Sequence, residues 1–237
     1  MMTLTQPFTN VYLLSCENKQ SLAEVMMRMQ EHYESPFPEI VGQYVDRDLY
    51  ESLYIERISK PLYDKNYCTY AEDWGGFNVP SHAVRSFYEL HDEYDLDCME
   101  YSLKHMLEDA LSGDDKFYLI AIHEDQPIDF KSTTYLHELA HAFYYLDPIY
   151  KSHMDSLVGE LPKRMYAGLK KELLRDGYTE GVVDDEIQAY LSTDRLSDLD
   201  SWEYSYVISL KHYAKFQRKY DSYIDVLHLN NGDIGNG

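Results

Sequence analysis

The chain has 237 residues, of which 44% are hydrophobic and 27% are charged. This composition is typical of a globular protein with one large domain or two small ones. Its 42 acidic residues outnumber its 21 basic residues, so the formal net charge is −21 at pH 7. Nucleic acids and anionic membranes require a basic surface, and the acidic excess therefore argues against both as partners.

The sequence carries no sign of membrane insertion or secretion. No stretch of 18 apolar residues is present, and residues 1–7 lack the basic and apolar blocks of a secretory signal. The three cysteines, Cys16, Cys68 and Cys98, are odd in number and widely spaced, which favours free thiols over disulfides or a zinc-binding pair. We therefore expect a cytoplasmic protein.

The first half of the chain is predicted to combine helices with two strands. A short buried strand is expected over 11–15, and loop and turn over 66–80. Residues 116–123 are aromatic and β-branched and are bounded by turn residues, which gives the clearest strand of the chain. Apolar residues at helical spacing predict helices over 21–33, 46–58, 81–90 and 99–111.

The second half is predicted to be helical. Helices are expected over 132–146, over 152–174 with a break near Pro162, over 183–196, and from a capping pattern at Asp200 to about residue 227. A turn is expected over 177–181. The pattern as a whole predicts an α+β fold, mostly helical with a small mixed sheet.

We expect one domain over 1–229. It would consist of an N-terminal part, 1–110, and a second part, 116–229, that holds the motif described next. Residues 230–237 are predicted to form a flexible tail.

One motif, at residues 137–141, carries chemistry: His-Glu-Leu-Ala-His. Residues four apart share one face of a helix, with Cβ atoms about 5–6 Å apart, so His137 and His141 can reach one Zn²⁺ together. Glu138 is displaced around the helix, where it can accept a proton from zinc-bound water without binding the metal. Two surface histidines on an amphipathic helix are the plainer alternative.

The strand, the connector and this helix, residues 116–146, resemble the active-site segment of the zincin metallopeptidases. In that family the active-site helix follows a mixed sheet, and an edge strand of the sheet binds an extended peptide. The resemblance implies a zincin-like domain that hydrolyses peptide bonds with Zn²⁺. Glu138 would then be the general base and afterwards the acid for the leaving amine.

The third metal ligand depends on the branch of the family. Gluzincins take a glutamate from a later helix, which implies Glu186, with Asp185 as an alternative; an acidic first turn without a metal role is the plainer reading. Metzincins continue the motif to a ligand at the position of Asp147. Here Tyr144 stands where that branch has glycine, and Asp147 followed by Pro148 more simply ends a helix.

Two supporting positions stay open. Some gluzincins place an aspartate four residues after the glutamate ligand, where it orients a histidine. This chain has Tyr190 there, and Asp194 is a candidate for the role. A hydrogen-bond donor to the developing oxyanion is also expected. Tyr190 and His212 are candidates, but among 24 tyrosines the sequence does not choose.

The sequence therefore predicts a zinc metallopeptidase with a peptide or protein substrate. His137, His141 and Glu186 would hold Zn²⁺, and Glu138 would be catalytic. The substrate-binding residues, the cleavage preference and the oligomeric state do not follow from the sequence. Two other functions are open: a zincin-like fold used for binding or regulation, and a helical interaction protein without a metal.

Overall fold

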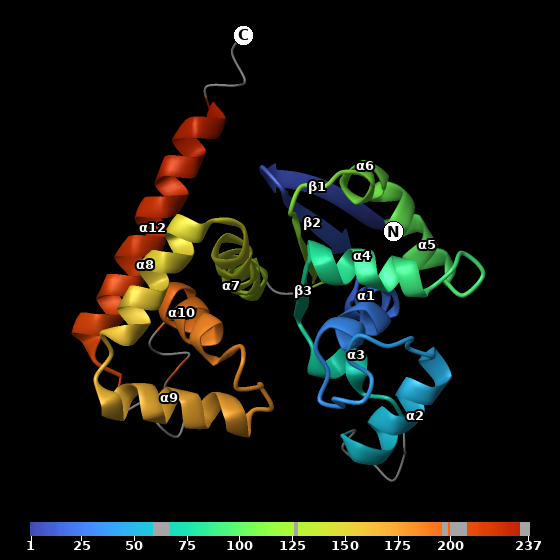
Figure 1. Ribbon diagram of the computed structural model, residues 1–237, viewed down its shortest axis with the longest axis horizontal. Helices are drawn as coiled ribbons and strands as arrows, with labels where there is room; N and C mark the ends of the chain where they lie inside the picture. Colours follow the sequence, from blue (N-terminus) through green and yellow to red (C-terminus); the bar gives the residue numbers. More distant parts are fainter. Residues whose placement is uncertain (59–66, 126–127, 196–198, 200–207, 233–237) are drawn as a thin grey trace. The chain divides into compact units, whose positions relative to one another are not determined.

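The computed structural model describes residues 1–58, 67–125, 128–195, 199 and 208–232 (Figure 1). The chain forms two compact units, unit 1 with residues 1–134 and unit 2 with residues 135–237. Most described residues are helical and one sheet is present, which confirms the expected α+β class. The expectation of a single domain over 1–229 stays a prediction.

Unit 1 is built on a four-stranded mixed sheet with the strand order β1-β2-β4-β3. β4 pairs in parallel with β2 and antiparallel with β3, while β1 and β2 form an antiparallel hairpin. The hairpin turn contains Asn10 at φ 62°, a conformation that asparagine tolerates better than most residues. The strands are β1 (Met2–Phe8), β2 (Val11–Cys16), β3 (Gly76–Pro80) and β4 (Tyr118–His123).

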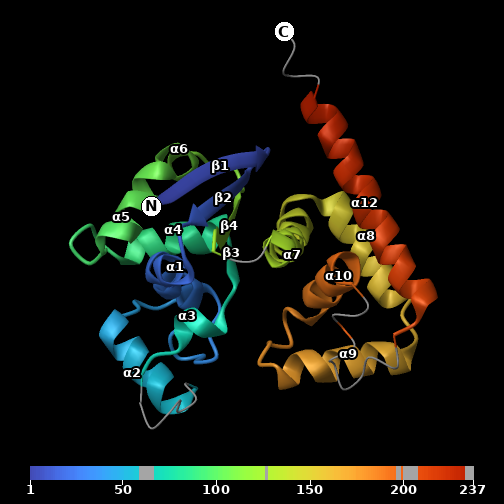
Figure 2. The ribbon, with the colours of Figure 1, turned by 180° about the vertical axis from the view of Figure 1, so that it is seen from behind.

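Six helices accompany this sheet in unit 1. They are α1 (Lys19–Tyr33), α2 (Arg47–Arg57), α3 (Tyr70–Asp73), α4 (Ser81–Leu90), α5 (Cys98–Met106) and α6 (Glu108–Ser112). α1 contacts β2, β3 and β4 and also α3, α4 and α5, so it lies at the centre of the unit (Figure 2). Its apolar face, with Leu22, Met26 and Met29, is fully buried against the sheet residues Leu14 and Leu119.

Unit 2 is helical throughout its described residues. Its helices are α7 (Ile128–Leu146), which begins before the unit boundary, α8 (Pro148–Gly159), α9 (Lys163–Arg175), α10 (Val183–Thr193) and α12 (Leu210–Gly232). α10 contacts α8, α9 and α12, and α8 also contacts α12. Aromatic residues fill the core where Phe143 of α7, Tyr150 of α8 and Tyr220 of α12 are buried.

Several predicted elements differ from the structure. Residues 66–80, predicted as loop and turn, contain α3 and β3, and β1 was not predicted. The helix predicted over 99–111 is divided at Leu107 into α5 and α6. The break near Pro162 is confirmed, but α8 already begins at Pro148. The predicted cap at Asp200 lies outside the described residues, and α12 continues to Gly232.

The three cysteines are free: Cys16 is buried, Cys68 is partly buried and Cys98 is exposed. Cys16 lies in β2, in the interior of the sheet, and burial raises the pKa of its thiol to about 11. Within the described part of the chain, no helix has the length and apolar character needed to cross a membrane.

Candidate metal centre

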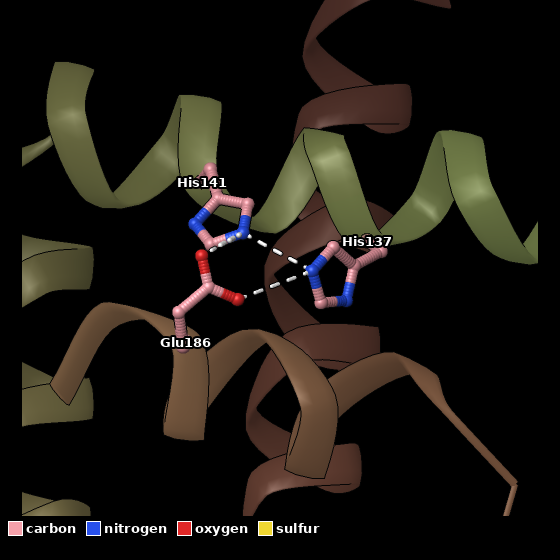
Figure 3. A group of neighbouring side chains, drawn as sticks. All are labelled: His137, His141 and Glu186. Atoms are coloured by element: carbon pink, nitrogen blue, oxygen red, sulfur yellow. Dashed lines mark hydrogen bonds and ion pairs between the residues drawn. The ribbon is translucent and has the colours of Figure 1, made fainter. Parts of the chain in front are cut away.

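Two helices of unit 2 bring three side chains together, as Figure 3 shows. His137 and His141 project from successive turns of α7, and Glu186 projects toward them from the first turn of α10. The Nε2 atoms of the two imidazoles lie 3.2 Å apart. Each Nε2 is 3.6 Å from one carboxylate oxygen of Glu186, Oε2 for His137 and Oε1 for His141. One potential ligand atom from each residue lies within 4.8 Å of the others, near enough for all three to bind one metal ion.

The burial of this group favours a bound cation. His141 and Glu186 are buried, and the Oε2 atom of Glu186 is buried without a hydrogen-bond partner. A buried carboxylate oxygen without a partner is costly, and a metal ion would satisfy it. Two imidazole nitrogens and one carboxylate oxygen are also ligands that zinc accepts. The residues therefore fit a metal ion, although they do not determine its identity.

The electric field at the site also attracts positive charge. Burial lowers the pKa of His141, but the carboxylates of Asp185 and Glu186 outweigh that effect and raise the pKa to about 9. Burial likewise opposes charge on His137, yet Asp194, Glu186 and Glu138 raise its pKa well above the ordinary value. In the metal-free protein, acidic groups thus hold protons on the imidazoles, in the place where a metal cation would supply the charge instead.

Both histidines face a second carboxylate with their other ring nitrogen. Nδ1 of His141 lies 2.9 Å from Oδ1 of Asp185, and Nδ1 of His137 lies 3.7 Å from Oδ1 of Asp194. Carboxylates in this position orient metal-binding imidazoles and fix which nitrogen carries the proton. Asp194 thus lies where its candidate role requires. Asp185, considered above as a ligand, instead contacts the outer side of His141.

Glu138 is buried beside two tyrosines. Burial is the main cause that raises the pKa values of Tyr178 and Tyr190, and the negative charges of Glu186 and Glu138 add to it. The two hydroxyls are 3.1 Å apart, and the ring of Tyr190 meets that of His137 edge-on at a centroid distance of 4.6 Å. Tyr190 is therefore placed beside the cluster, as one of the two sequence candidates.

Tyr178 was not identified from the sequence. It follows Gly177, which ends α9 at φ 105°, and its backbone N–H donates to the carbonyl of Leu173 at 3.1 Å. This hydrogen bond back into the last turn is typical of a helix end with glycine in a left-handed conformation. Gly177 signals the turn, but only the packing of α9 against α10 shows that the next residue reaches the histidines.

The remaining sequence candidates lie elsewhere in unit 2. Asp147 is the N-cap of α8, where its Oδ1 accepts hydrogen bonds from the backbone N–H groups of Ile149 and Tyr150. His212 lies in the first turn of α12. Neither belongs to the group of described residues that could hold a metal. Asp147 therefore serves as a helix cap, which was its plainer interpretation.

Comparison with protein-family models, with curated proteins and with solved structures found no match to this chain.

Proposed function

We propose that this protein is a zinc-dependent peptidase with His137, His141 and Glu186 as metal ligands. The observation that carries the proposal is the buried Glu186 carboxylate, which faces the Nε2 atoms of both histidines of the His-Glu-x-x-His helix. The resemblance of residues 116–146 to the zincins supports peptide bonds as the substrate.

The number of protein ligands favours a catalytic over a structural site. Structural zinc sites are closed by four protein ligands, whereas catalytic sites use three and leave one position open. Among the described residues, only these three are placed to hold a metal ion. A bound Zn²⁺ would supply Lewis acidity and lower the pKa of a coordinated water to about 7.

Glu138 is the proposed general base. It follows His137 on α7, so its side chain leaves the helix about 100° from that ligand, in accord with 3.6 residues per turn. Its charge acts on Tyr178 and Tyr190, so it lies on the side of the cluster where these hydroxyls meet. From there Glu138 accepts the proton of the attacking water and delivers it to the nitrogen of the leaving amine.

The two tyrosines are the proposed donors to the oxyanion. Their raised pKa values keep both hydroxyls protonated at neutral pH, and a protonated hydroxyl can donate to the negative oxygen that forms from the scissile carbonyl. The contact between Tyr190 and His137 fixes one ring, and the hydrogen bond between the hydroxyls couples the second to it. The site therefore has a donor ready before the substrate binds.

Metal content and peptide cleavage together test the proposal. Elemental analysis of protein purified without added zinc should find about one zinc per chain in the wild type and much less in Glu186→Ala. Glu180→Ala, which removes an exposed carboxylate of the same unit, is the matched control and should keep its zinc. The wild type should cleave members of a peptide library.

Two outcomes would contradict the proposal. Absence of zinc from the wild type after addition of the metal would remove the metal site altogether. A wild type that holds zinc and cleaves no peptide of the library would leave a zincin-like binding or regulatory module in place of a peptidase.

A further inference from the structure

A fully buried amide lies behind the metal-ligand cluster. Gln188 is in α10, and none of its surface is exposed. Its Nε2 donates to Oδ1 of Asp185 at 3.0 Å, and its Oε1 accepts a hydrogen bond from the hydroxyl of Tyr150 at 3.2 Å. Because the amide donates at one end and accepts at the other, these two partners allow only one orientation of the group.

This amide is connected to a metal ligand through Asp185. The Oδ1 atom of Asp185 receives Nε2 of Gln188, and Nδ1 of His141 lies 2.9 Å from the same oxygen. A continuous path of polar contacts therefore leads from His141 through Asp185 and Gln188 to Tyr150. All four residues belong to unit 2 and come from three helices, α7, α8 and α10.

The far end of the path is anchored in the aromatic core. Tyr150 is fully buried in α8. Its ring centroid lies 5.9 Å from that of Phe143, two residues after His141 on α7, and 4.7 Å from that of Tyr223 on α12. A close-packed ring holds its hydroxyl in a fixed place, because interiors pack at crystal-like density.

We infer that Gln188 and Tyr150 are positioning residues for the metal ligand His141, acting through Asp185. The Asp185 side chain is 27% exposed and could otherwise turn toward water. The amide of Gln188 keeps its Oδ1 against Nδ1 of His141. That contact retains the proton on Nδ1 and leaves the Nε2 lone pair directed at the metal site.

The inference rests on the proposed function only in that His141 binds a metal. It does not require that peptides are cleaved. It also differs from the expectation formed on the sequence, in which the orienting residue was sought after Glu186, at Tyr190 or Asp194. The structure instead assigns the support of His141 to a carboxylate before Glu186 and to an amide after it.

Zinc affinity measures the effect directly. Gln188→Met keeps the length of the side chain but removes both hydrogen bonds, and Tyr150→Phe keeps the ring but removes the donor to Gln188. Competition with a chromophoric chelator at one fixed pH should show zinc binding weakened about 10- to 100-fold in Gln188→Met. Tyr150→Phe should show a smaller loss in the same direction.

A second readout separates positioning from general stability. The visible absorption bands of Co²⁺ bound in place of zinc depend on ligand geometry, and they should shift in both variants. Tyr166→Phe is the matched control, because it removes a tyrosine hydroxyl that donates to Asp184 at 2.9 Å, one residue away from Asp185. It should leave both zinc affinity and the Co²⁺ spectrum unchanged.

Each result decides the matter. Wild-type zinc affinity and an unchanged Co²⁺ spectrum in Gln188→Met and Tyr150→Phe would overturn the inference and leave the proposed peptidase intact. The expected losses in a protein that cleaves no peptide would support the inference while the peptidase fails. A wild type that binds no metal would overturn both. If Gln188→Met does not fold, Tyr150→Phe decides by the same two readouts.

Discussion

Glu138 shows how one displaced residue separates metal binding from chemistry. It is buried next to His137 but does not belong to the group that could hold the metal. We expect Glu138→Gln to keep its zinc, because all three proposed ligands remain, and to lose about 10²- to 10⁴-fold in kcat, because the amide cannot accept the proton. Elemental analysis and peptide cleavage on one preparation test this. Retained activity would exclude Glu138 as the base.

Glu31 is a carboxyl buried in the apolar core of unit 1. It accepts a hydrogen bond from the hydroxyl of Tyr70 at 2.9 Å, and burial raises its pKa from 4.5 to about 7. The folded state therefore binds this proton more tightly than the unfolded state. The stabilisation that results is complete below pH 4.5 and is lost as the pH rises through 7.

The variant Glu31→Gln removes this titration. From pH 5 to pH 8 the free energy of unfolding of the wild type should fall by about 3 kcal/mol relative to that of the variant. Urea denaturation at both pH values measures the difference. Glu24→Gln, on the exposed face of the same helix, is the control and should follow the wild type. Parallel pH profiles for the wild type and Glu31→Gln would contradict the assignment.

At the scale of elements, the end of α9 determines where Tyr178 lies. Gly177 has φ 105°, which side-chain-bearing residues rarely adopt, although its Cβ position is sterically open. Gly177→Ala should therefore destabilise the protein by about 1–3 kcal/mol through backbone strain. It should also lower kcat, because Tyr178 is displaced from the hydroxyl of Tyr190.

The matched control for this change is Gly159→Ala. Gly159 ends α8, has equal space for a Cβ atom and does not have a positive φ. Thermal denaturation and cleavage assays on both variants separate backbone strain from the added methyl group. Equal behaviour of the two variants would show that the conformation of Gly177 does not matter.

The elements that the sequence predicted are those whose own residues determine them. α4 matches its predicted bounds, because apolar side chains recur there at helical spacing. β3 was missed because it is a short edge strand that contains Gly76, Asn78 and Pro80, residues that are depleted in strands. β1 is the other edge strand, and it contains Pro7.

The candidate site was predictable only in part, for the same reason. His137, Glu138 and His141 form a local pattern, and Glu186 was reached through the family resemblance. Tyr178 and the path from Asp185 through Gln188 to Tyr150 depend on how helices pack against one another. No spacing along the sequence encodes that packing.

At the scale of the whole molecule, the proposed ligands all belong to one unit. His137, His141 and Glu186 lie in unit 2, whereas β4 belongs to unit 1. A metal that binds only the folded state adds about 4 kcal/mol of stability when its free concentration is 1,000 times its Kd. Zinc removal should therefore lower the free energy of opening of α7 and α10 more than that of β4.

Hydrogen exchange followed by mass spectrometry measures this difference. With a chelator present, peptides from α10 should exchange faster, and peptides from β4 should exchange at the rate seen with zinc. Glu186→Ala should show the fast exchange of α10 with or without the chelator. Equal acceleration in β4 and α10 would show that the two units open together.

The proposed ligands donate through nitrogen and oxygen, and none of them through sulfur. Zinc sites built from cysteine release their metal when the thiolates are oxidised, whereas imidazole and carboxylate ligands withstand the same oxidants. Oxidation of the exposed Cys98 would leave these ligands untouched, and the thiol of Cys16 is protected by its burial and its high pKa. The centre is therefore suited to hold its metal under both reducing and oxidising conditions.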